Sequence, residues 1–257
     1  MTLYIFFVIN PKGKMEESVK VVILCGGKGL RLRKDPALPK PLVEIGGLPI
    51  LWHIMKIYAH YGFNSFILCL GFKGDKIKEY FENRGNRHPE FNPSEFEIEF
   101  VDTGLNTETG GRVKLIEKYI KEENFFLTYA DGLADINLND LYNFHLKNNK
   151  ILTMTCVRAK SQFGICEIND KNEVVNFEQK PLLKDWVNGG FFVCNRKIFD
   201  YLDVNDILEE KPFQKLIEDK QICAYKFTGF WACMDTYKDA IMLNEAWNQG
   251  KAKWKIW

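Results

Sequence analysis

The sequence lacks a C-x-x-C pair and has no histidines at metal-binding spacing. Its seven cysteines are scattered, and most of them end apolar runs such as VVILC, FILC and FFVC. That placement is typical of buried, reduced thiols, and it disfavours both a disulfide framework and a zinc site. We therefore expect a cytoplasmic protein whose cysteines are structural.

Strong net charge and a long hydrophobic run are also missing. The formal net charge is +1, so no bulk electrostatic attraction to nucleic acid or to a membrane is expected. The apolar N-terminal stretch MTLYIFFVIN is too short to span a bilayer and follows no cationic segment. We expect residues 1–17 to be a disordered extension or a consequence of start-site choice, and residues 18–257 to form one domain.

Strand-like and helix-like segments alternate in the first part of the chain, which predicts an α/β fold. Strands are predicted over 19–25, 65–71, 96–102 and 124–131, and helices over 49–62, 73–83, 109–120 and 138–149. The strands are almost continuously apolar, which favours a mostly parallel sheet with helices on both faces. Beyond Ile151 short strands follow one another, and we expect mixed or antiparallel strands inserted into this layer at 151–157, 163–169, 173–179, 186–195 and 221–227.

The glycine-rich turn after the first strand completes neither common phosphate-binding motif. In CGGKGLRL, Leu32 stands where a dinucleotide fingerprint needs its third glycine, and the prolines that follow prevent an immediate long helix. A P-loop is absent because no Lys-Ser or Lys-Thr follows at the required spacing. These absences exclude a dinucleotide-dependent dehydrogenase.

What the turn does contain suits a triphosphate. Exposed backbone N–H groups are followed by cations at Lys28, Arg31, Arg33 and Lys40. A surface loop with scattered basic residues would show the same pattern. The turn alone therefore leaves both interpretations open.

Carboxylates at a strand end raise the possibility of a magnesium site. Asp131 follows FFLTY at the end of a predicted parallel strand, Asp135 lies four residues on, and Asp235 lies in GFWACMDT. Two carboxylates beside a triphosphate are the usual protein ligands of Mg²⁺, although a lone aspartate at a strand end is more often a turn or cap residue.

Three further polar residues stand at positions suited to binding. Arg112 follows two glycines at a predicted helix start, which favours anions. Asn188 precedes a glycine pair, which indicates a ligand nearby or a β-bulge. Lys180 is expected in a turn. None of the four histidines is assigned a role.

Six ordered segments together resemble the sugar nucleotidyltransferases, from about Lys20 to Trp254. GGKGLRL with PKPLVEIGG marks the wider superfamily. The segments PILWHIMKIYAHYG, VDTGLNTETGGR, YADGLADIN, WVNGGFFV and GFWACMDT resemble the branch of the glucose-1-phosphate cytidylyltransferases. The resemblance implies a Rossmann-like nucleotidyltransferase fold with a small mixed β region for the substrate.

The resemblance also implies a reaction and its participants. CMP would pass from CTP to a phosphorylated acceptor, glucose 1-phosphate, releasing pyrophosphate and giving a CDP-activated product for surface polysaccharide. Mg²⁺ would be the cofactor, and the protein would be a homo-oligomer with no nucleic-acid or membrane partner. Because a phosphate is itself a nucleophile, no general base is required.

Site residues carry over position by position. Catalytic roles would fall to Arg31, Lys40 and Lys180, and metal binding to Asp131 and Asp235. The nucleotide would contact Cys25, Gly26, Gly27, Gly29, Arg31, Lys40, Thr109, Gly110, Arg112 and Ala130. The acceptor would contact Gln179, Lys180, Asn188 and Gly189.

Four departures from the family pattern bear on the acceptor. Leu30 replaces a usual threonine, Gln179 a usual glutamate and Cys233 a usual proline, and the loop between residues 82 and 97 is shorter. They keep open a different acceptor, either another sugar phosphate or a non-sugar such as the glutamine phosphate of capsule modification. A catalytically silent regulatory or binding subunit is disfavoured, since it would have no chemical need for all four of the retained residues Lys40, Asp131, Lys180 and Asp235.

Overall fold

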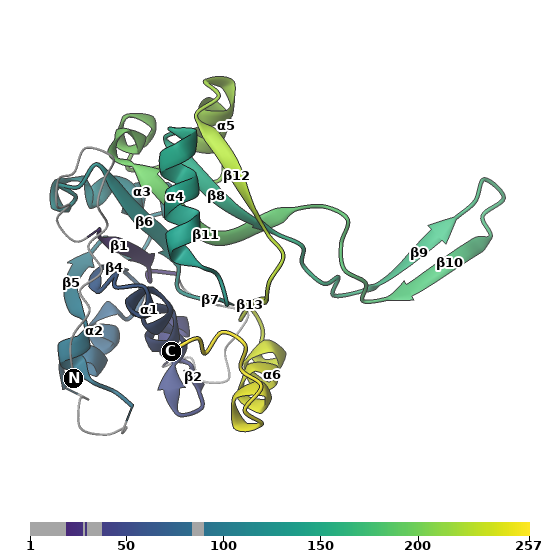
Figure 1. Ribbon diagram of the computed structural model, residues 1–257, viewed down its shortest axis with the longest axis horizontal. Helices are drawn as coiled ribbons and strands as arrows, with labels where there is room; N and C mark the ends of the chain where they lie inside the picture. The colour runs from purple at the N-terminus through teal and green to yellow at the C-terminus, as the bar shows by residue number, and fades with distance from the viewer. Residues whose placement is uncertain (1–18, 28, 30–37, 84–89) are drawn as a thin grey trace.

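A seven-stranded sheet forms the centre of the computed structural model (Figure 1). The structure describes residues 19–27, 29, 38–83 and 90–257, so the expected extension over 1–17 and Arg31 lie outside the described residues. The strand order is β12-β8-β11-β6-β1-β4-β5. The strands are β1 Val21–Leu24, β4 Ser65–Leu70, β5 Glu97–Asp102, β6 Asn124–Tyr129, β8 Leu152–Val157, β11 Val187–Asn195 and β12 Ile222–Phe227.

Within this sheet, β11 runs against the other strands. β1 pairs in parallel with β4 and β6, β4 with β5, and β8 with β12, whereas β11 is antiparallel to both β6 and β8. The prediction of a mostly parallel sheet with inserted strands is therefore confirmed for the segments that form β8, β11 and β12.

Helices cover both faces because successive apolar strand residues point in opposite directions. In β1, Val21 and Ile23 belong to one buried cluster, and Val22 and Leu24 to the other. The first cluster includes residues of α1 Ile50–His60, α2 Gly74–Asn83, α4 Leu138–Asn148 and α6 Tyr237–Asn248. The second includes residues of α3 Thr109–Leu115, α5 Lys211–Glu218 and the 3-10 helix η5 Arg196–Tyr201.

Shorter elements complete the described chain. They are β2 Glu44–Ile45, β3 Leu48–Pro49, β7 Gly132–Ala134, β13 Trp231–Cys233, η2 Lys40–Leu42, η3 Pro93–Glu95 and η4 Glu117–Tyr119. The helix predicted over 109–120 ends at Leu115 and is followed by η4. Among the described residues, no helix combines the length and the apolar character needed to cross a membrane.

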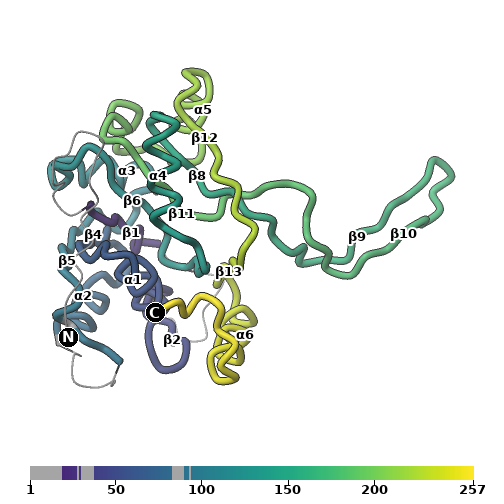
Figure 2. Tube along the Cα trace, viewed as in Figure 1, coloured from purple at the N-terminus to yellow at the C-terminus, as the bar shows by residue number. Residues whose placement is uncertain are grey.

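Two strands form an arm outside the central sheet. Among the described residues, β9 Gly164–Ile168 and β10 Val174–Gln179 pair only with each other, as an antiparallel hairpin that extends away from the body of the protein (Figures 1 and 2). Their predicted insertion into the α/β layer is therefore wrong. A strand buried on both faces must be apolar on both, whereas one face of this hairpin carries the charged residues Glu167 and Glu178 beside Ile165.

The cysteine prediction is confirmed in part. All seven cysteines are unpaired, and Cys25, Cys69, Cys156 and Cys194 are buried. Cys166 is exposed because it lies on the arm, which sequence reasoning had placed inside the sheet.

Candidate active site

The Lys40 side chain joins the two aspartates that the sequence suggested as metal ligands. Its Nζ donates hydrogen bonds to Asp131 Oδ2 at 2.6 Å and to Asp235 Oδ1 at 2.8 Å. The three residues come from distant parts of the chain, and sequence alone could not show that they meet. Together with the Cys233 thiol, the two carboxylates place their ligand atoms within 4.8 Å of one another.

Pairing of two short strands brings the aspartates together. Asp131 immediately precedes β7, Asp235 follows β13, and Cys233 is the antiparallel partner of Gly132. The main-chain N–H of Met234 also donates to the main-chain oxygen of Asp131 at 2.9 Å. This main-chain hydrogen bond fixes the spacing of Asp131 and Asp235 independently of the charge of their carboxylates.

The start of α6 fixes Asp235 from the other side. Thr236 is the N-cap, and its side chain forms a reciprocal capping box with Asp239. The Asp239 carboxylate also accepts the N–H of Asp235 at 3.1 Å. Asp235 is thus held through its main-chain N–H just before the start of α6, while its carboxylate contacts Lys40.

Opposite charges set the protonation state of Lys40. Burial alone disfavours its charged form, but the Asp131 charge and the hydrogen bonds to Asp131 and Asp235 together raise the pKa of Lys40. Burial, with the same two carboxylates nearby, raises the pKa of the Cys233 thiol. Lys40 is therefore a cation and Cys233 a neutral thiol at neutral pH.

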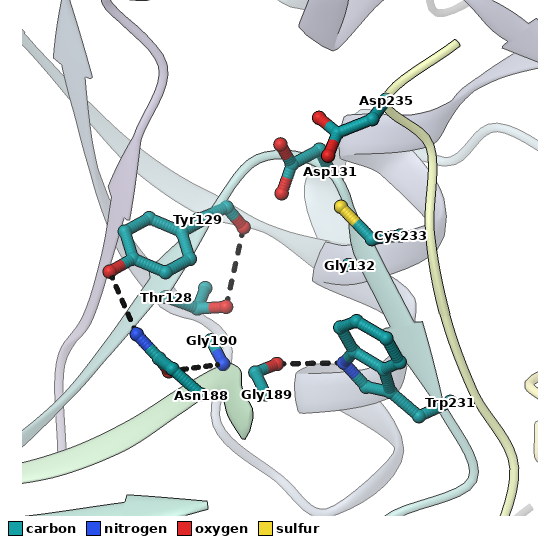
Figure 3. Close-up of a pocket in the computed structure, with 10 residues that line it drawn as sticks. All are labelled: Thr128, Tyr129, Asp131, Gly132, Asn188, Gly189, Gly190, Trp231, Cys233 and Asp235. Atoms are coloured by element: carbon teal, nitrogen blue, oxygen red, sulfur yellow. Dashed lines mark hydrogen bonds between the residues drawn. The ribbon is translucent and has the colours of Figure 1, made fainter. Parts of the chain in front are cut away.

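A pocket of about 240 Å³ opens beside these carboxylates (Figure 3). Its lining comes from the ends of β6 and β11 and from β7 and β13, and comprises Thr128, Tyr129, Asp131, Gly132, Asn188, Gly189, Gly190, Trp231, Cys233 and Asp235. The pocket lies where parallel strands end, which is where open α/β sheets bind ligands. The two expected metal ligands thus share one cavity with two of the expected acceptor residues, Asn188 and Gly189.

Asn188 and the glycines after it form one wall of the pocket. The register of β11 against β8 shifts between Asn188 and Phe192, so the predicted bulge is present. Gly190 has φ +77°, and a Cβ there would lie 2.7 Å from the Tyr129 ring. The carbonyl of Gly189 accepts a hydrogen bond from Trp231 Nε1 at 2.8 Å, which ties this wall to β13.

Arg112 is buried behind the glycine-rich turn. Only 5% exposed, its guanidinium donates to the carbonyls of Leu70, Gly104 and Gly26, and to Thr103 Oγ1. A Cβ on Gly26 would lie 2.0 Å from Arg112 Nη1, which explains glycine at that position. In this arrangement Arg112 organises the ends of three strands, and direct contact with the nucleotide stays a prediction.

The other expected nucleotide contacts lie near the glycine-rich turn, just after β6 and at the start of α3. Cys25 and Ala130 are buried, and Gly29 has φ +55° and packs beside Lys40. Thr109 Oγ1 donates to Glu209 Oε2 at 2.7 Å, and Gly110 packs against the main chain of Asp206. Gly27 is exposed.

The expected acceptor residues are split between two places. Asn188 and Gly189 line the pocket, whereas Gln179 ends β10 on the arm and Lys180 follows it with φ +51°. The predicted turn at Lys180 is confirmed. The acceptor roles of Gln179 and Lys180 stay predictions, since neither belongs to the pocket lining.

Six residues of the pocket lining were given no role by sequence reasoning, namely Thr128, Tyr129, Gly132, Gly190, Trp231 and Cys233. Tyr129 directly precedes the Ala130–Asp131 pair, and Trp231 lies four residues before Asp235, so proximity to these aspartates could have revealed both. Cys233 was noted only as a departure from the family. Asp135 has a structural use instead, because its Oδ1 accepts the N–H of Phe230 at 2.7 Å.

Comparison with known proteins shows the family of the chain. The family model described as nucleotidyl transferase matches residues 20–248. The chain belongs to the nucleotidyl transferase family. This confirms the resemblance inferred from the six sequence segments.

Curated relatives match along nearly the whole chain. A probable glucose-1-phosphate cytidylyltransferase of Bacillus subtilis is 44% identical over 255 residues, covering 93% of this chain and 100% of the relative. The glucose-1-phosphate cytidylyltransferase of Salmonella typhimurium is 40% identical over 260 residues, with the same two coverages.

Solved structures confirm the fold. A UDP-glucose pyrophosphorylase complexed with UDP-glucose has a TM-score of 0.70 at 16% identity, covering 91% of this chain and 100% of its own. HddC from Yersinia pseudotuberculosis, complexed with GMP-PN, has a TM-score of 0.67 at 23% identity, covering 89% and 99%. At these identities the likeness concerns the Rossmann-like α/β architecture.

Proposed function

We propose that the protein transfers CMP from CTP to glucose 1-phosphate, releasing pyrophosphate and giving CDP-glucose. The observation that carries the proposal is the meeting of Lys40, Asp131 and Asp235 beside a pocket at the strand ends. The choice of CTP and glucose 1-phosphate rests on the names of the relatives at 44% and 40% identity. The product would serve surface polysaccharide synthesis.

The reaction requires alignment of the two substrates and neutralisation of the negative charge on their phosphates. A phosphate oxygen of the acceptor forms a bond to the α-phosphorus of CTP while the bond from that phosphorus to the β-phosphate oxygen breaks, and pyrophosphate leaves. The attacking phosphate is already anionic at neutral pH, so no general base is needed. Lys40, with Arg31 as proposed from the resemblance, would offset negative charge on the phosphates.

Asp131 and Asp235 are the proposed ligands of Mg²⁺. Their carboxylate oxygens fit an ion that prefers oxygen and commonly takes one or two carboxylates together with phosphate oxygens. The neutral Cys233 thiol is a poor ligand for it. When bound, Mg²⁺ supplies positive charge that reduces repulsion between the triphosphate and the incoming phosphate.

Asn188 is the proposed contact for the sugar. Its side-chain amide lies in the pocket and offers both a donor and an acceptor, which suits hydroxyl groups. Gly189 and Gly190 allow a ligand to approach the main chain closely.

A substrate screen tests the proposal. Pyrophosphate release is measured with CTP, UTP, dTTP and ATP, each crossed with glucose 1-phosphate, other sugar phosphates and glutamine phosphate. We expect turnover with CTP and glucose 1-phosphate. Turnover with UTP or dTTP but not CTP would overturn the cytidylyl assignment, and turnover only with a non-sugar phosphate would replace the acceptor.

We further propose that the arm mediates self-association. It exposes large apolar side chains, including Phe163 at 75% and Phe177 at 58%, which are unfavourable in water. Lys180, at the base of this arm, would reach the acceptor phosphate if the arm bent toward the pocket of its own chain or extended to the pocket of a second copy.

Light scattering tests this self-association. The parent chain should have a mass above that of one chain, and Phe163→Ser combined with Phe177→Ser should lower that mass. A monomeric parent chain would contradict the proposal.

A cytoplasmic location is proposed from the thiols. All seven cysteines are unpaired, as expected for a reducing compartment.

A further inference from the structure

The Glu209 carboxylate lies behind the pocket and contacts the pocket-lining residue Tyr129. The Tyr129 hydroxyl donates a hydrogen bond to Glu209 Oε1. Asn188 Nδ2 donates to the same hydroxyl oxygen at 3.3 Å, so a continuous chain of hydrogen bonds runs from Glu209 to Asn188. Figure 3 shows the Tyr129 hydroxyl and the Asn188 amide facing each other.

The charge of Glu209 determines the direction of these hydrogen bonds. An ionised carboxylate only accepts, and a phenol has a single hydrogen, so the Tyr129 hydroxyl must donate to Glu209 and accept from Asn188. These two contacts therefore fix the direction of the hydrogen bonds from Asn188 through Tyr129 to Glu209.

This direction fixes the side-chain amide of Asn188. Its Nδ2 points toward Tyr129, and its Oδ1 accepts the N–H of Gly190 at 2.9 Å. Each end of the amide keeps one further hydrogen-bonding position, one N–H and one lone pair. An amide held in one orientation can pair with hydroxyl groups in one defined arrangement, which is what selection of a polyhydroxylated acceptor requires.

The second oxygen of Glu209 is held by α3. Thr109 Oγ1 donates to Glu209 Oε2 at 2.7 Å and accepts the N–H of Leu208 at 2.9 Å. The main chain of α3 packs tightly against the segment that precedes Glu209, since a Cβ on Gly111 would lie 2.1 Å from the carbonyl oxygen of Val204. Glu209 is thus anchored on a rigid part of the chain.

We propose that Glu209 is a positioning residue for acceptor binding, acting through the Tyr129 hydroxyl on the Asn188 amide. The inference rests on the proposed function and adds to it a residue outside the pocket lining. Glu209 lies in ILEEKP, where no motif marks it, and only the folded chain brings it to Tyr129.

Glu209→Gln tests the role. Glutamine has one acceptor oxygen in place of two, and its amide N–H₂ would face either Thr109 or Tyr129, both of which act as donors to Glu209. We expect the KM for glucose 1-phosphate to rise about tenfold, the loss of roughly one hydrogen bond. The kcat and the KM for CTP should change by less than about twofold on the same reasoning.

A double-mutant cycle separates positioning from mere structural support. Tyr129→Phe removes the hydroxyl through which Glu209 acts, so Glu209→Gln should raise the acceptor KM no further in that background. A purely structural tie between Glu209 and α3 predicts a lower thermal midpoint and effects on both substrates that multiply in the double variant. An unchanged acceptor KM in Glu209→Gln, or multiplied effects, would overturn the proposal.

A matched pair elsewhere supplies the control. Tyr201 donates its hydroxyl to Asp219 Oδ2 at 2.7 Å on the exposed surface, and Tyr201→Phe with Asp219→Asn should leave both KM values unaltered. Turnover by the parent chain tests the proposed function, whereas the ratio of acceptor KM values between variants tests Glu209. The two can therefore fail separately.

Discussion

Asp131→Asn is expected to lower the rate of pyrophosphate release from CTP by about a thousandfold or more. The substitution keeps the size of the side chain but removes the charge that pairs with Lys40 and that we assign to Mg²⁺. The main-chain hydrogen bond between Met234 and Asp131 is retained, so the link between β7 and β13 persists. Steady-state pyrophosphate release with CTP, Mg²⁺ and glucose 1-phosphate measures the effect, and circular dichroism checks the fold.

Asp135→Asn is the matched control for this variant. Asp135 lies four residues further along, and its carboxylate accepts a single main-chain N–H, from Phe230. An asparagine oxygen can accept the same hydrogen bond, so activity should stay within about twofold. Near-normal turnover by Asp131→Asn would overturn the assignment of this carboxylate to the metal.

Lys40→Met is expected to have an effect nearly as large. Methionine occupies a similar volume but has no charge, so the triphosphate loses a cation that is only 15% exposed to solvent. We expect kcat/KM for CTP to fall by roughly 10²- to 10³-fold. In addition, Asp131 and Asp235 would no longer pair with an ammonium group, so binding of Mn²⁺ in the absence of nucleotide should tighten.

Two readouts distinguish Lys40 from its aspartate partners. Lys40→Met should raise the affinity for Mn²⁺, measured by electron paramagnetic resonance, whereas Asp131→Asn should lower it. Lys56→Met is the control, because Lys56 also pairs with a carboxylate, that of Glu95, but lies outside the pocket lining. Weaker Mn²⁺ binding by Lys40→Met, or an unaltered kcat/KM for CTP, would contradict the role given to Lys40.

Much of the fold could be predicted from apolar patterning. The strands that became β1, β4, β5 and β6 are predicted correctly because each apolar run has the length of a strand and is followed by a helical pattern. The arm was misplaced for a different reason. Strand propensity is satisfied equally by a hairpin in solvent, and the glutamates on one face of β9 and β10 were the available signal that they leave the sheet.

Site residues could be predicted only where a short sequence pattern around them indicates their position in the fold. Asp131 was found because it ends a strand, and Asn188 because it precedes a glycine pair at a bulge. The contact of Lys40 with both aspartates depends on the pairing of β7 with β13, which spacing along the chain does not encode. Glu209 lies 80 residues from Tyr129 in sequence, so nothing local could connect them.

The fate of the CTP phosphates tests the central claim most directly. The chain is incubated with glucose 1-phosphate, Mg²⁺ and CTP carrying a label in either the α- or the γ-phosphate, and the products are separated by chromatography. Nucleotidyl transfer at Lys40, Asp131 and Asp235 predicts α-label in CDP-glucose and γ-label in pyrophosphate, with both lost in Asp131→Asn. Transfer of γ-label to the acceptor, or α-label found only in CMP, would contradict the account.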